Sequence, residues 1–139
     1  MILIVNTTIR DRVLLGLIKN GKLIDRYNEI VNYRQAEKLL IIVDKLLRAH
    51  KLKVKNLHGV VVVVGPGGFS SVRLGIILAN TLGYSLDIPV VGLVATDFEN
   101  LEKLAKSGFR KIKNKKSFNM AQPFYGGEPN ITKPKKLKV

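Results

Sequence analysis

Cysteine is absent from this 139-residue chain, which excludes disulfide bonds and thiolate chemistry. Histidine is rare: His50 and His58 are eight positions apart without a recognisable acidic ligand pattern, so we expect surface or packing residues and no metal site. No apolar run approaches the ~20 residues that span a bilayer. The opening Met1-Ile2-Leu3-Ile4-Val5 also lacks a basic leader. We therefore expect a cytoplasmic protein that has no membrane partner.

Acidic residues are scarce as well: ten face 24 basic residues, which gives a net charge of +14. The excess lies toward the C-terminus, where only Glu128 is acidic after Arg110. Such a field attracts polyanions, and nucleic acid is the commonest one in the cytoplasm. The alternative is a solvated, solubilising tail. Phe118, Phe124 and Tyr125 are able to stack on bases, but no recognition pattern accompanies them. The candidate RNA contacts are Arg110, Lys111, Lys113, Lys115, Lys116, Lys135 and Lys136.

The order of hydrophobic patterns predicts a single α/β domain. Residues 2–5, 13–18 and 22–27 are typical of strands, and Asn20-Gly21 between the last two favours a tight hairpin turn. A helix is expected over 33–49, with Ala36, Leu39, Leu40, Val43, Leu46 and Leu47 as its core stripe. Residues 60–64 and 88–93 read as strands that each follow a helix, so right-handed crossovers make them parallel. The prediction is a three-strand antiparallel meander followed by two parallel crossover strands.

The helix expected over 71–85 is apolar nearly all round, which indicates cover on two sides. One cover is the sheet. The other is a partner protein, or alternatively the helix expected near 96–105 or the tail of the same chain. Gly75, Ala79 and Gly83 form a row of small residues that permits close backbone approach. The candidate partner interface is Ile41, Ile42, Leu74, Ile77, Leu78 and Thr81. We divide the chain into a domain at 1–106 and a basic linker with an extended C-terminal arm at 107–139.

A glycine-rich run, Gly65-Pro66-Gly67-Gly68-Phe69-Ser70-Ser71-Val72-Arg73-Leu74-Gly75, joins a strand directly to the apolar helix. A turn at a helix N-terminus suits an anion or a closely approaching backbone. The run matches neither common phosphate-loop motif, and Pro66 removes one N–H donor, so a tight corner is favoured over a nucleotide loop. Nearby serines lack a histidine base, so we expect no catalytic residue and no cofactor. The turn residues singled out are Gly65, Pro66, Gly67, Gly68, Phe69 and Arg73.

This run and the opening Ile2-Leu3-Ile4-Val5-Asn6-Thr7-Thr8 resemble the G-P-G-S-F-T-G-L-R-I-G and I-D-T-S motifs of the TsaB family, formerly YeaZ. Pro89-Val90-Val91-Gly92-Leu93 is similar to the family's following strand, and Pro123-Phe124-Tyr125 to its C-terminal segment. The resemblance covers residues 1 to about 105. It implies an actin-like, ribonuclease H-like half-domain in a short form that lacks most of the second half-domain.

The resemblance implies that the chain is not itself a catalyst. Members of the family pair with TsaD, an ATP-binding threonylcarbamoyl transferase that modifies the adenosine beside the anticodon of tRNA, and an ATPase, TsaE, joins the assembly. By analogy, the partner surface falls on the helices expected at 33–49 and 71–85. The sequence leaves open whether that surface binds a TsaD-like transferase or a second copy of the chain.

Several residues depart from the family pattern. Asn6 stands where Asp is usual and cannot supply an anionic magnesium ligand, Gln35 replaces a frequent His, and Ile41 a frequent Pro. Gly68, Ser70 and Ser71 replace Ser, Thr and Gly. These departures favour a non-catalytic scaffold subunit. The alternative function, motivated by the charge and the tail aromatics, is a general RNA-binding module that uses the basic C-terminal tail.

Overall fold

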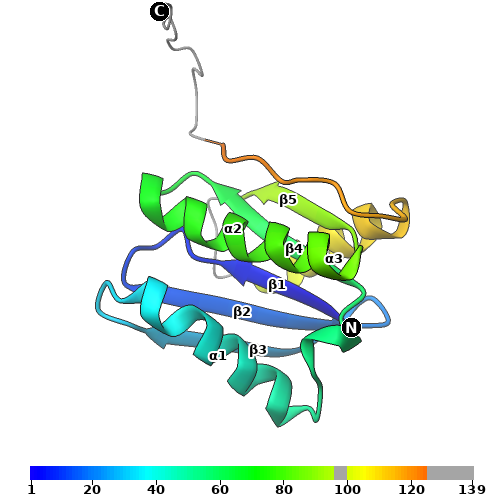
Figure 1. Cartoon of the computed structure of the whole chain (residues 1–139), viewed down its shortest axis with the longest axis horizontal. Helices are drawn as coiled ribbons and strands as arrows, with labels where there is room; N and C mark the ends of the chain where they lie inside the picture. Colours follow the sequence, from blue (N-terminus) through cyan, green and yellow to red (C-terminus); the bar gives the residue numbers. More distant parts are fainter. Residues whose placement is uncertain (96–99, 125–139) are drawn as a thin grey trace, which may run out of the picture.

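The computed structural model describes residues 1–95 and 100–124, which form a five-stranded sheet with the order β3-β2-β1-β4-β5 (Figure 1). Its strands are β1 (Ile2–Asn6), β2 (Arg12–Lys19), β3 (Lys22–Ile30), β4 (Gly59–Gly65) and β5 (Val90–Val94). The helices are α1 (Gln35–Ala49), α2 (Phe69–Leu86) and α3 (Leu101–Lys113), with a short 3₁₀ turn, η1, at Val54–Asn56. Strands β1, β2 and β3 pair antiparallel, and β4 is parallel to both β1 and β5. The predicted meander and crossovers are confirmed.

The hairpin between β2 and β3 follows from two residues. Asn20 and Gly21 both have positive φ, 52° and 81°, the backbone that a tight hairpin turn requires. They place Lys19 opposite Lys22, so the turn sets the pairing at this end of the hairpin. A Cβ on Gly21 would lie 3.0 Å from the ring of Phe109 in α3, so this glycine also lets the helix approach the hairpin.

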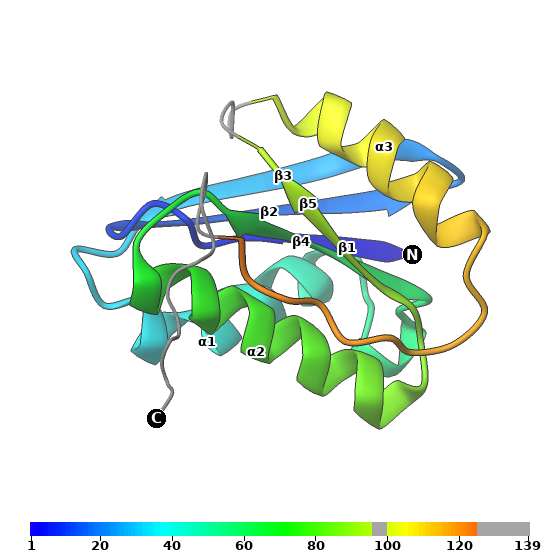
Figure 2. The same ribbon diagram turned by 90° about the horizontal axis from the view of Figure 1, so that it is seen from above.

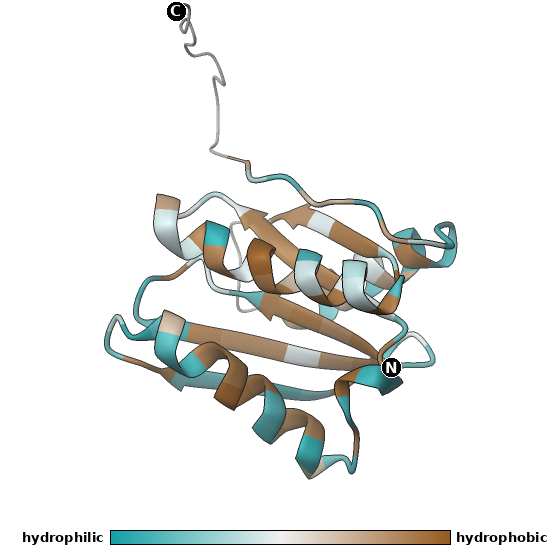
Figure 3. Ribbon diagram, viewed as in Figure 1, coloured by the Kyte–Doolittle hydropathy of each residue, from teal (hydrophilic) through white to brown (hydrophobic). Residues whose placement is uncertain are grey.

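The molecule has three layers, as Figure 2 shows: α1 and α2 cover one face of the sheet, and α3 covers the other. Strand β4 is buried along its whole length because it lies inside the sheet, between β1 and β5, with both faces covered. Its alternating valines divide between the layers: Val60, Val62 and Val64 pack toward α1 and α2, and Val61 and Val63 toward α3. Figure 3 shows the resulting, almost continuous hydrophobic colour of the central strands.

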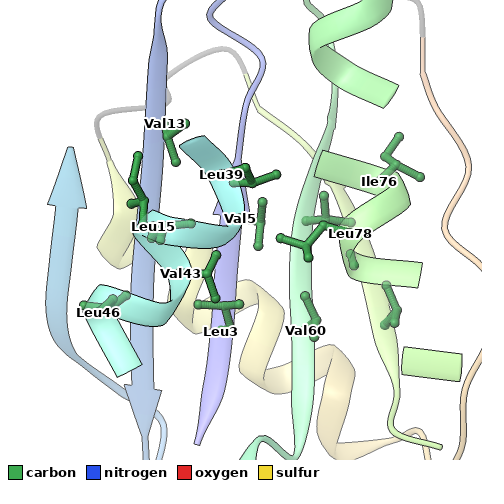
Figure 4. Close-up of a cluster of buried hydrophobic side chains, with 14 of the residues drawn as sticks. Leu3, Val5, Val13, Leu15, Leu39, Val43, Leu46, Val60, Ile76 and Leu78 are labelled. Atoms are coloured by element: carbon green, nitrogen blue, oxygen red, sulfur yellow. The ribbon is translucent and has the colours of Figure 1, made fainter. Parts of the chain in front are cut away.

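The larger core lies beneath α1 and α2 (Figure 4). Helix α1 contributes Leu39, Val43 and Leu46, and α2 contributes Ile76 and Leu78. Burying a side chain of this size contributes roughly 1.5–3 kcal/mol relative to leaving it in water. Most of the helical stability therefore comes from the contacts with the sheet.

The row of small residues in α2 faces the sheet. A Cβ on Gly75 would lie 2.7 Å from Oγ1 of Thr7, and a Cβ on Gly83 would overlap the side chain of Val90 and approach Phe118 to 2.6 Å. The prediction that this row permits close backbone approach is confirmed. The elements that approach are β1, β5 and the segment after α3.

Two predictions about the helices were wrong. In α1, Leu40 was assigned to the core stripe but is 66% exposed, and Ala36 is also exposed; Ile42 takes a core position instead. The last helix was expected over 96–105, whereas α3 begins at Leu101 and ends at Lys113, so the expected domain boundary at 107 falls inside it. The apolar stripe of α3 continues through Gly108 and Ile112, but the intervening lysines gave this segment the composition of a linker.

Residues 115–124, here called the arm, run back along α2 and β5 (Figure 2). Asn80 in α2 holds the backbone of Ala121 at both groups: its Nδ2 donates to the carbonyl oxygen at 3.1 Å, and its Oδ1 accepts from the N–H at 2.8 Å. The backbone N–H of Phe124 donates to the carbonyl oxygen of Val64 at 2.8 Å. The described part of the predicted extended segment thus lies against the domain. Tyr125, and the lysines at 135 and 136, lie outside the described residues.

Candidate functional site

The glycine corner after β4 is filled by the chain itself. Gly65 has φ 141°, and a Cβ there would overlap the carbonyl oxygen of Phe124 in the arm. A Cβ on Gly67 would lie 2.7 Å from the carbonyl oxygen of Thr8. Gly68 is the N-cap of α2 and supplies no side-chain cap. These close approaches are what a tight strand-to-helix corner needs, and they support that interpretation over a phosphate loop.

The segment after β1 ties the sheet to the start of α2. The Oγ1 of Thr7 donates to the carbonyl oxygen of Ser71 at 2.5 Å and accepts the N–H of Gly75 at 3.1 Å. Asn6 is fully buried, and its Oδ1 accepts from the N–H and the Oγ1 of Thr8 at 2.9 and 2.7 Å. Within the described residues Asn6 Nδ2 has no partner. The side-chain oxygens of Asn6 and Thr7 therefore bond within the fold. At the start of α2, the guanidinium carbon of Arg73 lies 4.3 Å from the ring centroid of Phe69.

Helices α1 and α2 expose a set of large apolar side chains on the outer side of this layer. The most exposed of them on α2 is Tyr84, and Ile77 lies near the middle of the helix, 62% exposed. A groove of about 240 Å³ lies between the N-terminal ends of the two helices, lined by Tyr33, Ala36 and Leu74 among others. We call this the α1–α2 surface. Its members are the exposed side chains of Tyr33, Leu40, Ile41, Phe69, Ile77 and Tyr84, together with the half-buried Leu74 and the exposed hydroxyl residue Thr81.

The structure divides the predicted interface residues. Ile41, Ile77 and Thr81 are exposed, and Leu74 is half-buried at the groove. The prediction that Ile42 and Leu78 lie on the surface was wrong, since their side chains are only 1% and 8% exposed and belong to the core. An all-round apolar helix gives no periodic signal that separates its flanks, so the sequence could not assign Leu78 to the sheet side.

Three residues of this surface, Tyr33, Leu40 and Tyr84, were not predicted from the sequence. Tyr33, just before α1, has φ 65°, a left-handed backbone conformation that is rare for a bulky residue and is not predicted from the residue type. Leu40 fits the i, i+3, i+4 pattern and was therefore assigned to the core. The arm contacts only one flank of α2, where the ring of Phe118 meets that of Tyr84 edge to face at 6.1 Å. Helix α3 packs on the opposite face of the sheet and does not cover this surface. Within the described residues the middle of the α1–α2 surface is therefore exposed.

The predicted RNA contacts Arg110, Lys111 and Lys113 belong to α3, and Lys115 and Lys116 follow it; all five are exposed. Helix α3 lies on the side of the sheet opposite the α1–α2 surface (Figure 2). Within residues 1–95 and 100–124 there is no cluster of three or more His, Asp or Glu side chains that could hold a metal ion. No helix in the same ranges has the length and apolar character needed to cross a bilayer.

Comparison with known proteins identifies the family. Residues 28–98, about half of the chain, match the family model described as TsaD, tRNA N6-adenosine threonylcarbamoyltransferase. The tRNA threonylcarbamoyladenosine biosynthesis protein TsaB of Bacillus subtilis is 31% identical over 94 residues, which cover 68% of this chain and 39% of that protein. The TsaB protein of Buchnera aphidicola from Schizaphis graminum is 32% identical over 115 residues, 83% of this chain and 51% of that protein. The chain belongs to the TsaB (YeaZ) family.

This TsaB-family chain spans about half or less of the length of those two curated relatives. It is also 35% identical to the tRNA N6-adenosine threonylcarbamoyltransferase of Geotalea daltonii over 65 residues, 47% of this chain and 19% of that protein. The structure of YeaZ from Pseudomonas aeruginosa matches with a TM-score of 0.61 at 24% identity, covering 67% of this chain and 44% of that one. The expected actin-like, ribonuclease H-like architecture is thereby confirmed for this TsaB-family chain.

Proposed function

We propose that this chain is a non-catalytic accessory subunit in tRNA threonylcarbamoyladenosine biosynthesis, and that its α1–α2 surface pairs with a TsaD-like transferase. The observation that carries the proposal is the set of large apolar side chains left open on both helices, with Ile41 and Ile77 each more than 60% exposed. Apolar patches of this kind mark protein contact sites, because covering them removes apolar area from water.

The family match supports the choice of partner. Residues 28–98 contain both α1 and α2, and this same segment matches the transferase family. The transferase of Geotalea daltonii also shares sequence with this chain, at 35% identity over 65 residues. Two related chains can pair through equivalent faces about a pseudo-twofold axis, as identical subunits do about a true one. The same argument makes a pair of two copies of this chain the competing arrangement.

The non-catalytic role is supported by the glycine corner and by Asn6. The carbonyl oxygen of Phe124 overlaps the position of a Cβ on Gly65, and that of Thr8 lies 2.7 Å from the position of a Cβ on Gly67, so the chain's own backbone packs closely against this corner. Asn6 offers a neutral amide where a carboxylate is usual, and its oxygen is already bonded to Thr8. A TsaE-like ATPase and tRNA are the further partners that we propose for the assembled complex.

Co-expression of the full chain with the TsaD-like transferase of the same source, followed by mass measurement of the purified complex, tests this proposal. We expect a complex that contains both proteins. Ile77→Glu and Ile41→Glu place a charge on the surface and should abolish co-purification. Ile24→Glu is the matched control, since Ile24 is exposed in the edge strand β3 and outside the α1–α2 surface.

Co-purification that survives both interface substitutions would contradict the proposed surface. A complex whose mass is twice that of this chain, with no transferase present, would assign the surface to a second copy. In either case circular dichroism of each variant shows whether the domain is folded. We expect both variants to fold, because Ile41 and Ile77 are mostly exposed and lie outside the main core.

A further inference from the structure

The exposed side of α3 carries a concentration of positive charge. Five of its thirteen residues are basic, and its one carboxylate, Glu102, is paired with Arg26 of β3 at 3.1 Å. That ion pair points the negative charge toward the hairpin strand and away from the remaining cations. Two more lysines follow directly after the helix. We call the exposed side of α3 and these two lysines the ridge. Its basic residues are Lys103, Lys106, Arg110, Lys111, Lys113, Lys115 and Lys116.

The helices on the other side of the sheet differ from α3. In α1, Arg48 pairs with Asp44 at 2.8 Å, and Arg34 just before the helix pairs with Glu37 at 2.8 Å. Helix α2 has a single charged residue, Arg73. The segment from Asn100 to Lys116 therefore carries seven basic side chains and one paired carboxylate, whereas α1 and the segment after it carry six basic side chains and two carboxylates, one of them paired within the helix.

Two cavities lie along α3 where it borders β5, and the charged residues that line them are all basic. One, of about 480 Å³, lies between α3 and the end of β5, and its cations are Lys103, Lys106 and Arg110. The other, of about 690 Å³, lies between the end of α3, β5 and the arm, and its cations are Lys111 and Lys115. Polar side chains accompany them: Asn100 and Ser107 in the first, and Asn114, Asn119 and Gln122 in the second.

The apolar side of α3 is occupied. Leu101, Leu104 and Ile112 are at most 7% exposed, because they pack on the second core beneath the sheet. A helix that binds a membrane surface inserts its apolar side into the lipid, and here that side is buried in the protein. The basic side chains of the ridge therefore face water, which suits a polyanion, although the cavities beside them also include the exposed apolar side chains of Val94 and Met120.

The spacing of the cations suits a chain of phosphates. Lys103, Lys106, Arg110 and Lys113 follow one side of α3 at intervals of three, four and three residues, a length of about 15 Å. Phosphates repeat every ~3.4 Å of axis along one strand of a duplex, so the ridge is long enough to face several of them. Amides of the kind that line the larger cavity hydrogen-bond to base edges and sugar hydroxyls.

We propose that α3 and its two flanking cavities form a binding site for the phosphate backbone of RNA. The identity of that RNA as tRNA rests on the proposed function, whereas the site itself rests on the charge and shape of α3. Because the ridge and the α1–α2 surface lie on opposite faces of the sheet, the chain is able to hold RNA and a protein partner at the same time. This arrangement makes the domain a bridge between the two.

Binding of transcribed, unmodified tRNA to the full chain, followed by fluorescence anisotropy at several salt concentrations, tests the site. The test variant combines Lys103→Gln, Lys106→Gln and Arg110→Gln. The matched control combines Lys38→Gln, Lys45→Gln and Arg48→Gln on α1, which removes the same charge from the opposite face. We expect the α3 variant to lose about tenfold or more in affinity and its salt slope to fall by about two, given ~0.7–0.9 per phosphate contact. The control should change affinity by less than about threefold.

Equal weakening by both triple variants would overturn the proposal, since net charge alone would then explain binding. A third variant replaces the four tail lysines at 133, 135, 136 and 138 by Gln in the full chain. Wild-type affinity in the α3 variant together with loss of binding in this third one would assign RNA to the tail and also overturn the proposal. Co-purification with the transferase is measured in parallel: its loss in the Ile77→Glu variant with RNA binding intact, or the reverse in the α3 variant, separates the two proposals.

Discussion

Ile77 and Leu78 are consecutive residues of α2, yet the side chain of Ile77 is 62% exposed and that of Leu78 only 8%. One step along an α-helix turns the side-chain direction by about 100°, which carries residue 78 from the outer side of the layer into contact with the core. The two positions therefore have different physical roles, although the sequence presents them as one apolar pair.

The first prediction concerns this pair. Leu78→Ala should lower the free energy of unfolding by about 2–5 kcal/mol, because it leaves a cavity in the main core. Ile77→Ala should change it by less than about 0.5 kcal/mol, because the side chain is mostly in water. Urea denaturation followed by circular dichroism measures both. Equal effects of the two substitutions would show that α2 is rotated relative to the arrangement described above.

The second prediction concerns Gln35, the buried first residue of α1. Its Nε2 points at three backbone carbonyl oxygens of the segment between β1 and β2, those of Thr7, Ile9 and Arg12, at 3.0, 2.7 and 2.6 Å. Gln35→Leu removes this donor and leaves buried acceptors without it, so the free energy of unfolding should fall by about 1–3 kcal/mol. Lys38→Leu, one turn later in α1, is the control and should stay within about 0.5 kcal/mol. The prediction fails if the two variants have the same denaturation midpoint.

The third prediction concerns pH. The Nε2 of His50 lies 2.7 Å from the Oδ2 of Asp25, and this hydrogen bond, together with the backbone N–H of Arg26, lowers the pKa of the Asp25 carboxyl below its ordinary value. A carboxyl group whose pKa is lower in the folded state stabilises the fold above the unfolded pKa, and loses that effect as pH falls through the folded pKa. The stability difference between wild type and Asp25→Asn should therefore be present at pH 5 and above and should shrink below about pH 4.

Denaturation midpoints of the two proteins at several pH values measure this third effect. The contribution is small, because the Asp25 side chain is 40% exposed and solvent screens the pair. Asp44→Asn, which removes the exposed carboxylate paired with Arg48, is a useful comparison outside the hairpin strand. A stability difference for Asp25→Asn that grows as pH falls below 4 would contradict the assignment.

Much of the fold could be predicted from the sequence because its signals are local. The dipeptide Asn20-Gly21 adopts the positive φ values that a tight hairpin needs, and it does so with little help from distant residues. The valine run 60–64 is too apolar for any position other than a covered central strand. The parallel direction of the last two strands then follows from the crossovers that precede them, whereas the strand order is read from the structure.

Helix α3 could not be placed from composition. Its start depends on Asn100, whose Oδ1 accepts the N–H of Lys103 at 3.2 Å, and its last turn depends on Ile112 reaching the second core. Lysine is compatible with a helix, a linker or a tail, so a lysine-rich segment shows its structure only through the few apolar residues that find a partner. For the same reason Arg110, Lys111 and Lys113, which were expected in a linker, belong to a folded helix.

The sequence by itself determined the sheet, the glycine corner and the family motifs, because each rests on backbone preferences and on side-chain patterns within a few neighbouring residues. The tertiary structure alone decided which apolar side chains are buried and which remain open. Leu78 and Ile42 pack in the core while Ile77 and Ile41 face outward, because burial depends on where the sheet and the other helices lie around each side chain. No local pattern contains that information.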